Sequence, residues 1–170
     1  RIGKCHAYGH GTEQNYEESA RWFQQAVEGN NSFAAYSMGS QYLRGQGVVQ
    51  NDKTAFDLFR LAATHPKQPN AYAQYQLGRM CRDGIGTEKN LEESKLWFAK
   101  AYAGFLTMEQ TMADDKLYYR LGSMNLYGLG TDKDLEKAEM YFNKAAILGN
   151  ADAVYGMGKL CLETDSEKAI

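Results

Sequence analysis

Residues 121–150 read LGSMNLYGLGTDKDLEKAEMYFNKAAILGN, and this stretch decides the fold because its pattern recurs along the chain about every 36 residues. Each copy carries an anchor glycine, and a Gly-x-Gly follows six residues later in the first four copies. The anchors are Gly3, Gly39, Gly78, Gly122 and Gly158. Periods of about 20 to 50 residues are the signature of solenoids and repeat arrays. The pattern therefore predicts stacked packing units, which more often form a recognition surface than a catalytic pocket.

The second half of each copy predicts an amphipathic helix. In the fourth copy Ala138, Tyr141, Phe142 and Ala145 follow the spacing i, i+3, i+4, i+7, which is one face of a helix. Four residues before the small position stands a residue of N-cap type, namely Asn15, Asn51, Asn90 and Asp134 in the four copies. The acids that complete a capping box with two of these caps are Glu18 and Glu93. We therefore interpret the acidic pairs in these helices as helix starts and not as catalytic carboxylates.

The first half of each copy predicts another helix, which ends at the Gly-x-Gly. Tyrosine stands three residues before the anchor in four copies, at Tyr36, Tyr75, Tyr119 and Tyr155. A glycine inside a helix costs about 1 kcal/mol relative to alanine, so the recurring anchor indicates a close contact with the partner helix. The Gly-x-Gly predicts left-handed backbone for the tight turn between the two helices.

The copies define one repeat domain with two long joints. We expect a partial repeat at residues 1–30, repeats at 31–69, 70–111 and 112–150, and a partial repeat at 151–170. Pro66 should stop the preceding helix near Thr64. The joint from Gly104 to Asp115 carries about eight extra residues and is expected to form a loop. In the fifth copy Glu163-Thr164 replaces the glycine loop, and Asp165 is the expected N-cap of a second helix. Neither end of the chain shows the polar terminal repeat that normally closes a repeat array, so we expect a fragment of a longer protein.

The co-registered pattern resembles the Sel-one-like repeat, a relative of the tetratricopeptide repeat. The best copy runs from Leu121-Gly122 through Gly128-Leu129-Gly130 and Tyr141-Phe142 to Gly149-Asn150. The resemblance implies an all-α, right-handed α-solenoid superhelix of antiparallel helix pairs. It also implies a scaffold for protein–protein contacts, often bacterial, with no catalytic residues to carry over.

Composition limits the other functions. The chain has 19 Lys and Arg residues against 21 Asp and Glu residues, so its overall charge does not favour binding to nucleic acid. No apolar run reaches the roughly 20 residues that a membrane-spanning helix needs. We expect no cofactor and no metal: His6 and His10 stand beside Cys5, but zinc sites usually show three or four spaced ligands. Cys5, Cys81 and Cys161 lie in different copies, too far apart for disulfides. We therefore expect buried, reduced cysteines and a cytoplasmic location.

On each first helix, one row of positions is not part of the packing pattern. These positions lie two residues before the anchor glycine, one residue after it and five residues after it. We call this set of positions the groove stripe, because in tetratricopeptide-like solenoids this side lines the concave groove. Its members are Ser37, Ser40 and Arg44, then Gln76, Arg79 and Asp83, then Arg120, Ser123 and Tyr127, and finally Lys159. Basic residues in each row predict a protein or peptide partner of acidic character and no catalysis. Two alternatives remain: a repeat appendage that positions or regulates a catalytic domain elsewhere, and a module that binds glycans or peptidoglycan fragments. The sequence leaves the oligomeric state open.

Overall fold

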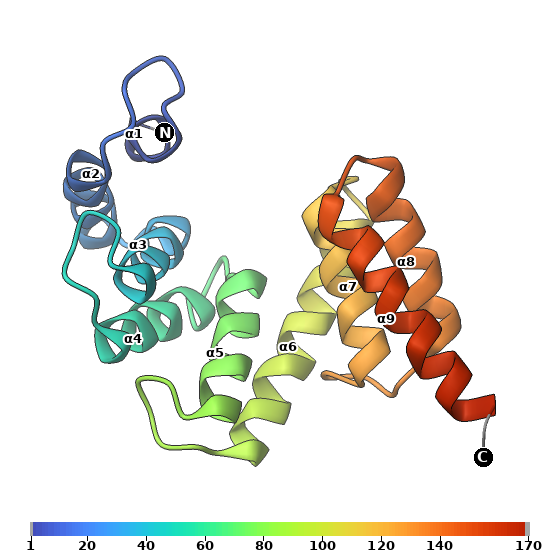
Figure 1. Ribbon diagram of the computed structural model, residues 1–170. Coiled ribbons are helices and arrows are strands. Elements are labelled where there is room, and N and C mark those ends of the chain that lie inside the picture. Colours follow the sequence, from blue (N-terminus) through green and yellow to red (C-terminus); the bar gives the residue numbers. More distant parts are fainter. Residues whose placement is uncertain (1, 169–170) are drawn as a thin grey trace. The chain divides into compact units, whose positions relative to one another are not determined.

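The computed structural model describes the backbone of residues 2–168 and the side chains of residues 2–163. Over this range the chain folds into nine α-helices without a β-strand (Figure 1), which confirms the all-α prediction. Two compact units are present: one ends at Trp97 and the other begins at Phe98. In chain order the helices are α1 (Ile2–Tyr8), α2 (Tyr16–Glu28), α3 (Ser32–Arg44), α4 (Asp52–Ala63), α5 (Ala71–Asp83), α6 (Leu91–Glu109), α7 (Asp115–Tyr127), α8 (Leu135–Ile147) and α9 (Ala151–Lys168).

The second helices α2, α4, α6 and α8 begin at the predicted N-caps. The side chain of Asn51 accepts a hydrogen bond from the Thr54 amide at 2.9 Å, and that of Asp134 accepts one from the Lys137 amide at 2.9 Å. Asn15 and Asn90 cap their helices in the same way. At the other end of α4, the helix stops at Ala63, as expected from the following proline.

One hydrogen bond of the predicted capping box, from the backbone N–H of the N-cap residue to the glutamate side chain, does not form. The backbone N–H of each cap donates to a carbonyl of the preceding first helix instead of to the glutamate. Asn15 donates to His6 at 2.8 Å, and Asn90 donates to Cys81 at 2.8 Å. The carboxylate of Glu93 is therefore left to accept a hydrogen bond from Trp97 Nε1 at 3.1 Å. The cap thus joins the two helices of one copy as well as starting the second.

The anchor glycines Gly3, Gly39 and Gly122 pack against the phenylalanine of the second helix, which confirms the predicted close contact in these copies, whereas Gly158 in the fifth copy has open space around it. A β-carbon built on Gly39 would lie 3.0 Å from the ring of Phe59, so the helices approach closely only because glycine has no side chain. The recurring tyrosine packs on the same ring: the Tyr36 and Phe59 ring centroids lie 5.7 Å apart. Tyr119 repeats this contact with Phe142 at 5.8 Å. These contacts form the core between the two helices of a copy.

The glycine loops adopt the left-handed backbone that the sequence predicts. At the turn between α3 and α4, Gly45 and Gly47 have φ angles of 66° and 72°. The second glycine also lies directly against the previous copy, since a β-carbon on Gly47 would collide with the backbone of Tyr16 at the start of α2. Gly86 meets Asp52 at the start of α4 in the same way.

The expected loop from Gly104 is wrong, because its first part extends α6. This helix has 19 residues, whereas α8 has 13. The extension adds a second buried phenylalanine to this helix: Phe105 follows Phe98 after seven residues, and both side chains are buried. We call this seven-residue spacing of the two phenylalanines the heptad of α6. Gly130 of the next glycine loop accordingly lies against the backbone of Phe98 and not against a residue at the start of the helix.

The fifth copy departs from its prediction. Helix α9 continues from Ala151 to Lys168, so the cap expected at Asp165 is wrong: without the glycine pair, the helix does not turn. The three cysteines are free, but only Cys81 is fully buried. Cys5 is half-buried and Cys161 is exposed, which corrects the expectation that all three lie in the core.

Candidate protein-interaction groove

On α3 the groove stripe offers one exposed cation beside two serines. Arg44 is exposed in the last turn, whereas Ser37 and Ser40 are half-buried. Both serine hydroxyls donate to carbonyls of their own helix, Ser37 to Phe33 at 2.9 Å and Ser40 to Tyr36 at 3.0 Å. The two serine hydroxyls therefore already have hydrogen-bond partners within α3, and the Arg44 guanidinium is the charged group among the three stripe residues of this helix.

On α5 one residue of the groove stripe is buried, and the negative charge of another is paired with a neighbouring arginine. Gln76 is only 7% exposed, so it does not lie on the open surface that the sequence predicted for it. Arg79 and Asp83 are exposed. Arg82 donates to both carboxylate oxygens of Asp83, at 2.7 Å from Nε and 2.9 Å from the second guanidinium nitrogen. This hydrogen bonding lowers the pKa of Asp83, and the acid is already engaged within the chain.

In the second unit the stripe ends in a cation between two tyrosines. Arg120 and Ser123 on α7 are half-buried, whereas Tyr127 at its end is 48% exposed. The ammonium of Lys159 on α9 lies 5.8 Å from the ring centroid of Tyr127 and 4.8 Å from that of Tyr155. Hydrogen bonding to Tyr127 is the largest cause that raises the pKa of Lys159. Exposed aromatic faces and a held cation can contact an anion or a sugar ring.

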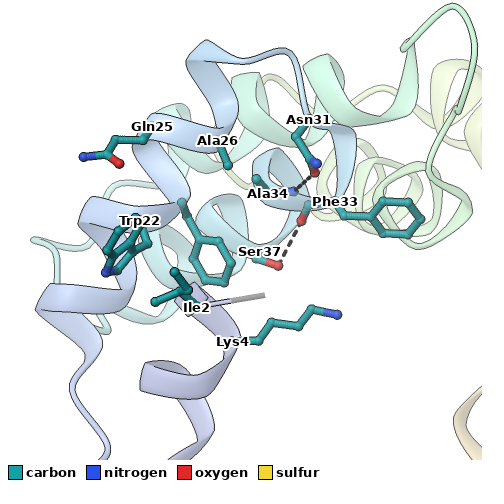
Figure 2. A pocket seen from close by; sticks show the side chains of 11 residues that line it. Ile2, Lys4, Trp22, Gln25, Ala26, Asn31, Phe33, Ala34 and Ser37 are labelled. Carbon is teal, nitrogen blue, oxygen red and sulfur yellow. Dashed lines mark hydrogen bonds between the residues drawn. The ribbon is translucent and has the colours of Figure 1, made fainter. Parts of the chain in front are cut away.

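A cavity beside the stripe was not predicted from the sequence. It has a volume of about 520 Å³ and lies between α1, α2 and α3 (Figure 2). Its aromatic lining consists of Trp22, Phe23 and Phe33, and its polar lining of Lys4, Gln25, Asn31 and Ser37. Phe33 is 56% exposed and stands four residues before Ser37, on the same side of α3. An apolar residue in a stripe of polar ones is the signal that could have revealed it.

The described part of the chain was also searched for metal-binding clusters and for membrane-spanning helices. No cluster of three or more His, Cys, Asp or Glu side chains there could hold a metal ion. None of the described helices is long and apolar enough to cross a membrane.

Comparison with protein families explains the repeat. The family model described as Sel1 repeat matches residues 1–31, 32–65, 71–104 and 116–150. The chain belongs to the Sel1 repeat family. The residues between these matches, 66–70 and 105–115, fall at the two long joints, and the second segment contains the extra turns of α6. Proteins of this family generally mediate protein–protein interactions.

Two curated proteins resemble parts of this Sel1 repeat chain. A protein named chitin synthase regulator SKT5, from Malassezia restricta, is 33% identical over 104 residues, which cover 59% of this chain and 7% of the relative. An uncharacterized protein of Neisseria meningitidis is 29% identical over 100 residues, covering 58% of this chain and 21% of its own length. The similarity thus spans a small part of both relatives.

Solved structures of Sel1 repeat proteins share the fold. A Sel1 repeat protein from Oxalobacter formigenes aligns with a TM-score of 0.58 and 29% identity, covering 89% of this chain and 58% of that one. A protective antigen of uropathogenic Escherichia coli, described as having an SLR fold, aligns with a TM-score of 0.56 and 21% identity. It covers 89% of this chain and 38% of its own. The all-helical chain therefore has the Sel1-like solenoid fold.

Proposed function

We propose that this chain is a non-catalytic scaffold that binds an acidic peptide or protein segment along the part of the groove stripe that lies on α3 and α5. The observation that carries the proposal is the charge left exposed on α3 and α5. Arg44 and Arg79 are exposed, while the one acid in these rows, Asp83, is already bonded to Arg82. A surface with exposed guanidinium groups attracts carboxylates and can bind them through two parallel hydrogen bonds.

The cavity beside Phe33 supports the same reading. Its aromatic lining offers space for an apolar side chain of the bound segment, and Lys4 adds a cation at its edge. Peptide-binding grooves commonly combine an apolar anchor pocket with charges that select the partner. The favoured ligand is therefore an acidic segment that also carries a bulky apolar residue.

A peptide library of graded net charge tests this proposal. Acidic peptides with an aromatic or aliphatic residue should be enriched, and fluorescence anisotropy should show affinity that falls as salt increases. The double variant R44E/R79E should bind an enriched peptide at least tenfold more weakly, from an estimate of about 1.4 kcal/mol or more for lost charge-assisted contacts. Arg60→Glu is the matched control because Arg60 is an exposed arginine on the second helix α4. Equal binding by R44E/R79E and the parent, or enrichment of basic peptides, would contradict the groove assignment.

A glycan-binding function has one observation in its favour, the arrangement around Lys159. Tyr127 and Tyr155 are 48% and 64% exposed and flank the ammonium. Aromatic rings stack on sugar faces, and a cation can hold the carboxylates of peptidoglycan fragments. Calorimetric titration with muropeptides and with chitin oligosaccharides tests it: saturable heat that Tyr127→Ala abolishes supports this function, and no heat rejects it.

A regulatory appendage is the third candidate. One relative is named as a regulator of chitin synthase, although this chain matches only 7% of it. In that case, the scaffold would act on an enzyme through a protein contact. Co-purification of a defined enzyme with the natural full-length protein, lost when this repeat region is deleted, would support it.

A further inference from the structure

The last turn of α5 differs from the equivalent turns of the copies before and after it at two neighbouring positions. Four residues after the anchor glycine, those copies carry Leu43 and Leu126, whereas this copy carries Arg82. Leu126 is 1% exposed and Leu43 is half-buried, so the position otherwise holds an apolar packing side chain. At the next position, which belongs to the groove stripe, this copy carries Asp83, where neither of the other two has an acid. The unusual arginine and the unusual acid therefore stand side by side.

An acid at this place acts against both the helix and the proposed groove. Asp83 is the last residue of α5, where the helix dipole disfavours negative charge. It also follows Arg79 by four residues, a spacing that places both side chains on one face of the helix. A carboxylate without a partner would repel an acidic segment at the stripe, and it would attract the Arg79 guanidinium that should bind that segment.

Arg82 binds both oxygens of this carboxylate. Its Nε donates to one oxygen at 2.7 Å, and a terminal guanidinium nitrogen donates to the other at 2.9 Å. Two parallel bonds of this kind are the strong form of an arginine–carboxylate contact. The hydrogen bond from Arg82 is the largest of the causes that lower the pKa of Asp83, and the charges of Arg79 and Lys89 are smaller causes. Arg82 is therefore the main partner of this acid.

The place of Arg82 in the helix suits it to this task. Its side chain is 42% exposed, so more than half of its surface is covered by protein. A long arginine stem can lie against apolar surface while its guanidinium reaches a polar partner. Arg79, four residues before Asp83, is exposed at the surface. The turn therefore holds its acid and leaves an exposed cation on the stripe.

We propose that Arg82 is a positioning residue that sets the charge selectivity of the groove: it holds Asp83, so that α5 presents the Arg79 guanidinium to an acidic partner. This inference rests on the proposed function, because it explains how a stripe that contains an acid selects acidic segments. Arg82 acts through Asp83 and does not need to touch the partner. An exposed ion pair contributes little to stability, so the effect of Arg82 should appear in charge selection and not in folding.

A first experiment tests the pairing without any ligand. Nuclear magnetic resonance follows the titration of the Asp83 carboxyl in the parent, in Arg82→Leu and in Arg79→Gln. Leucine is the residue of the neighbouring copies at this position, so Arg82→Leu should have the circular dichroism spectrum of the parent. The pKa of Asp83 should rise in Arg82→Leu and rise less in Arg79→Gln. No rise in Arg82→Leu, or a larger rise in Arg79→Gln, would overturn the proposal.

A second experiment measures the charge selection itself. The probe is a labelled peptide of glutamates around a central tryptophan, and fluorescence anisotropy gives its affinity. Arg82→Leu should bind this peptide at least about threefold more weakly than the parent. Asp83→Asn should bind it like the parent, because the acid is already held, and the double variant R82L/D83N should also regain the affinity of the parent. If Asp83→Asn strengthens binding as much as Arg82→Leu weakens it, the two charges act independently and the proposal is overturned.

The outcomes separate this inference from the proposed function. If the parent does not bind the peptide, the acidic-segment function is wrong, and the role of Arg82 in it is overturned as well. If the parent binds the peptide and Arg82→Leu binds it equally well, the proposed function is retained and only the role of Arg82 is wrong. Weaker binding by Arg82→Leu that Asp83→Asn restores supports both.

Discussion

The ring of Phe142 lies 2.7 Å from the place where a β-carbon on Gly122 would stand. Two helices of the fourth copy are therefore in contact at a point that admits no side chain. Because the neighbouring atoms belong to a fully buried ring, the ring cannot move away without disturbing the core.

Overpacking a core usually costs about 1 to 3 kcal/mol, and alanine gains about 1 kcal/mol in helix propensity. We therefore expect Gly122→Ala to destabilise the protein by up to about 2 kcal/mol. Gly158→Ala is the control: it occupies the same repeat position in open space, so its stability should be equal or higher. Urea unfolding followed by circular dichroism measures both, and equal stability of the two variants would show that the ring contact is unimportant.

The glycine loop between α7 and α8 allows backbone strain to be separated from collision. Gly128 and Gly130 have φ angles of 64° and 73°, so alanine at either site costs about 1 to 2 kcal/mol. Only Gly130 also lies against the backbone of Phe98. Gly130→Ala should therefore be the more destabilising substitution in thermal unfolding. Gly128→Asn should cost least, because asparagine tolerates the left-handed region, and the reverse order would argue against the contact with α6.

Glu109, in the extension of α6, binds two side chains of α8. It accepts a hydrogen bond from the Tyr141 hydroxyl at 2.8 Å and pairs with Lys144 at 2.9 Å. Tyr141→Phe removes the bond to a charged acceptor in a site that is 5% exposed, and we expect a loss of about 1.5 to 3 kcal/mol. In a Glu109→Gln background the same substitution should cost less. A double-mutant cycle measures this coupling, and additive losses would mean that the bond does not stabilise the fold.

Cys81 and Cys161 occupy the same repeat position but should differ in reactivity. Burial is the main cause that raises the pKa of Cys81 to about 11, and the charge of Glu93 adds to it. At pH 8 a thiol reagent should label exposed Cys161 rapidly and Cys81 only after unfolding. Between pH 9 and 11 the unfolded chain loses this thiol proton while the folded protein retains it, so stability should fall as the pH rises. Mass spectrometry of Cys81→Ala and Cys161→Ala identifies the labelled site, and rapid native labelling of Cys81 would refute the assignment.

The sequence predicted the fold well where the signal is local and periodic. The caps, the anchor contacts and the glycine turns depend on spacings within one copy. The caps at Asn15, Asn51, Asn90 and Asp134 were confirmed, as were the contacts of Gly3, Gly39 and Gly122, whereas the cap at Asp165 and the contact of Gly158 were wrong. The capping box failed because Glu93 has the same spacing whether it returns to Asn90 or bonds to Trp97. A carbonyl of the preceding helix decides between these outcomes, and it lies outside the local pattern.

The candidate site was harder to predict because exposure depends on neighbouring helices. Ser37 and Gln76 hold the same position of the stripe, two residues before the anchor, yet the first is half-buried and the second is buried. Val154 of α9 and Ala35 of α3 likewise hold the same repeat position, yet the first is 65% exposed and the second is 1% exposed. Whether the groove stripe binds a partner remains a prediction.

The duplicated heptad of α6 determines which changes in length this helix can accept. Seven residues turn an α-helix by about 700°, only about 20° short of two full revolutions, so Phe98 and Phe105 keep nearly the same angular phase. Removing or adding a single residue between them would rotate Phe105 by about 100° and carry it off that face. In evolution or in design, this segment can therefore be lengthened or shortened by whole heptads, whereas a change of one or two residues would remove Phe105 from its buried position.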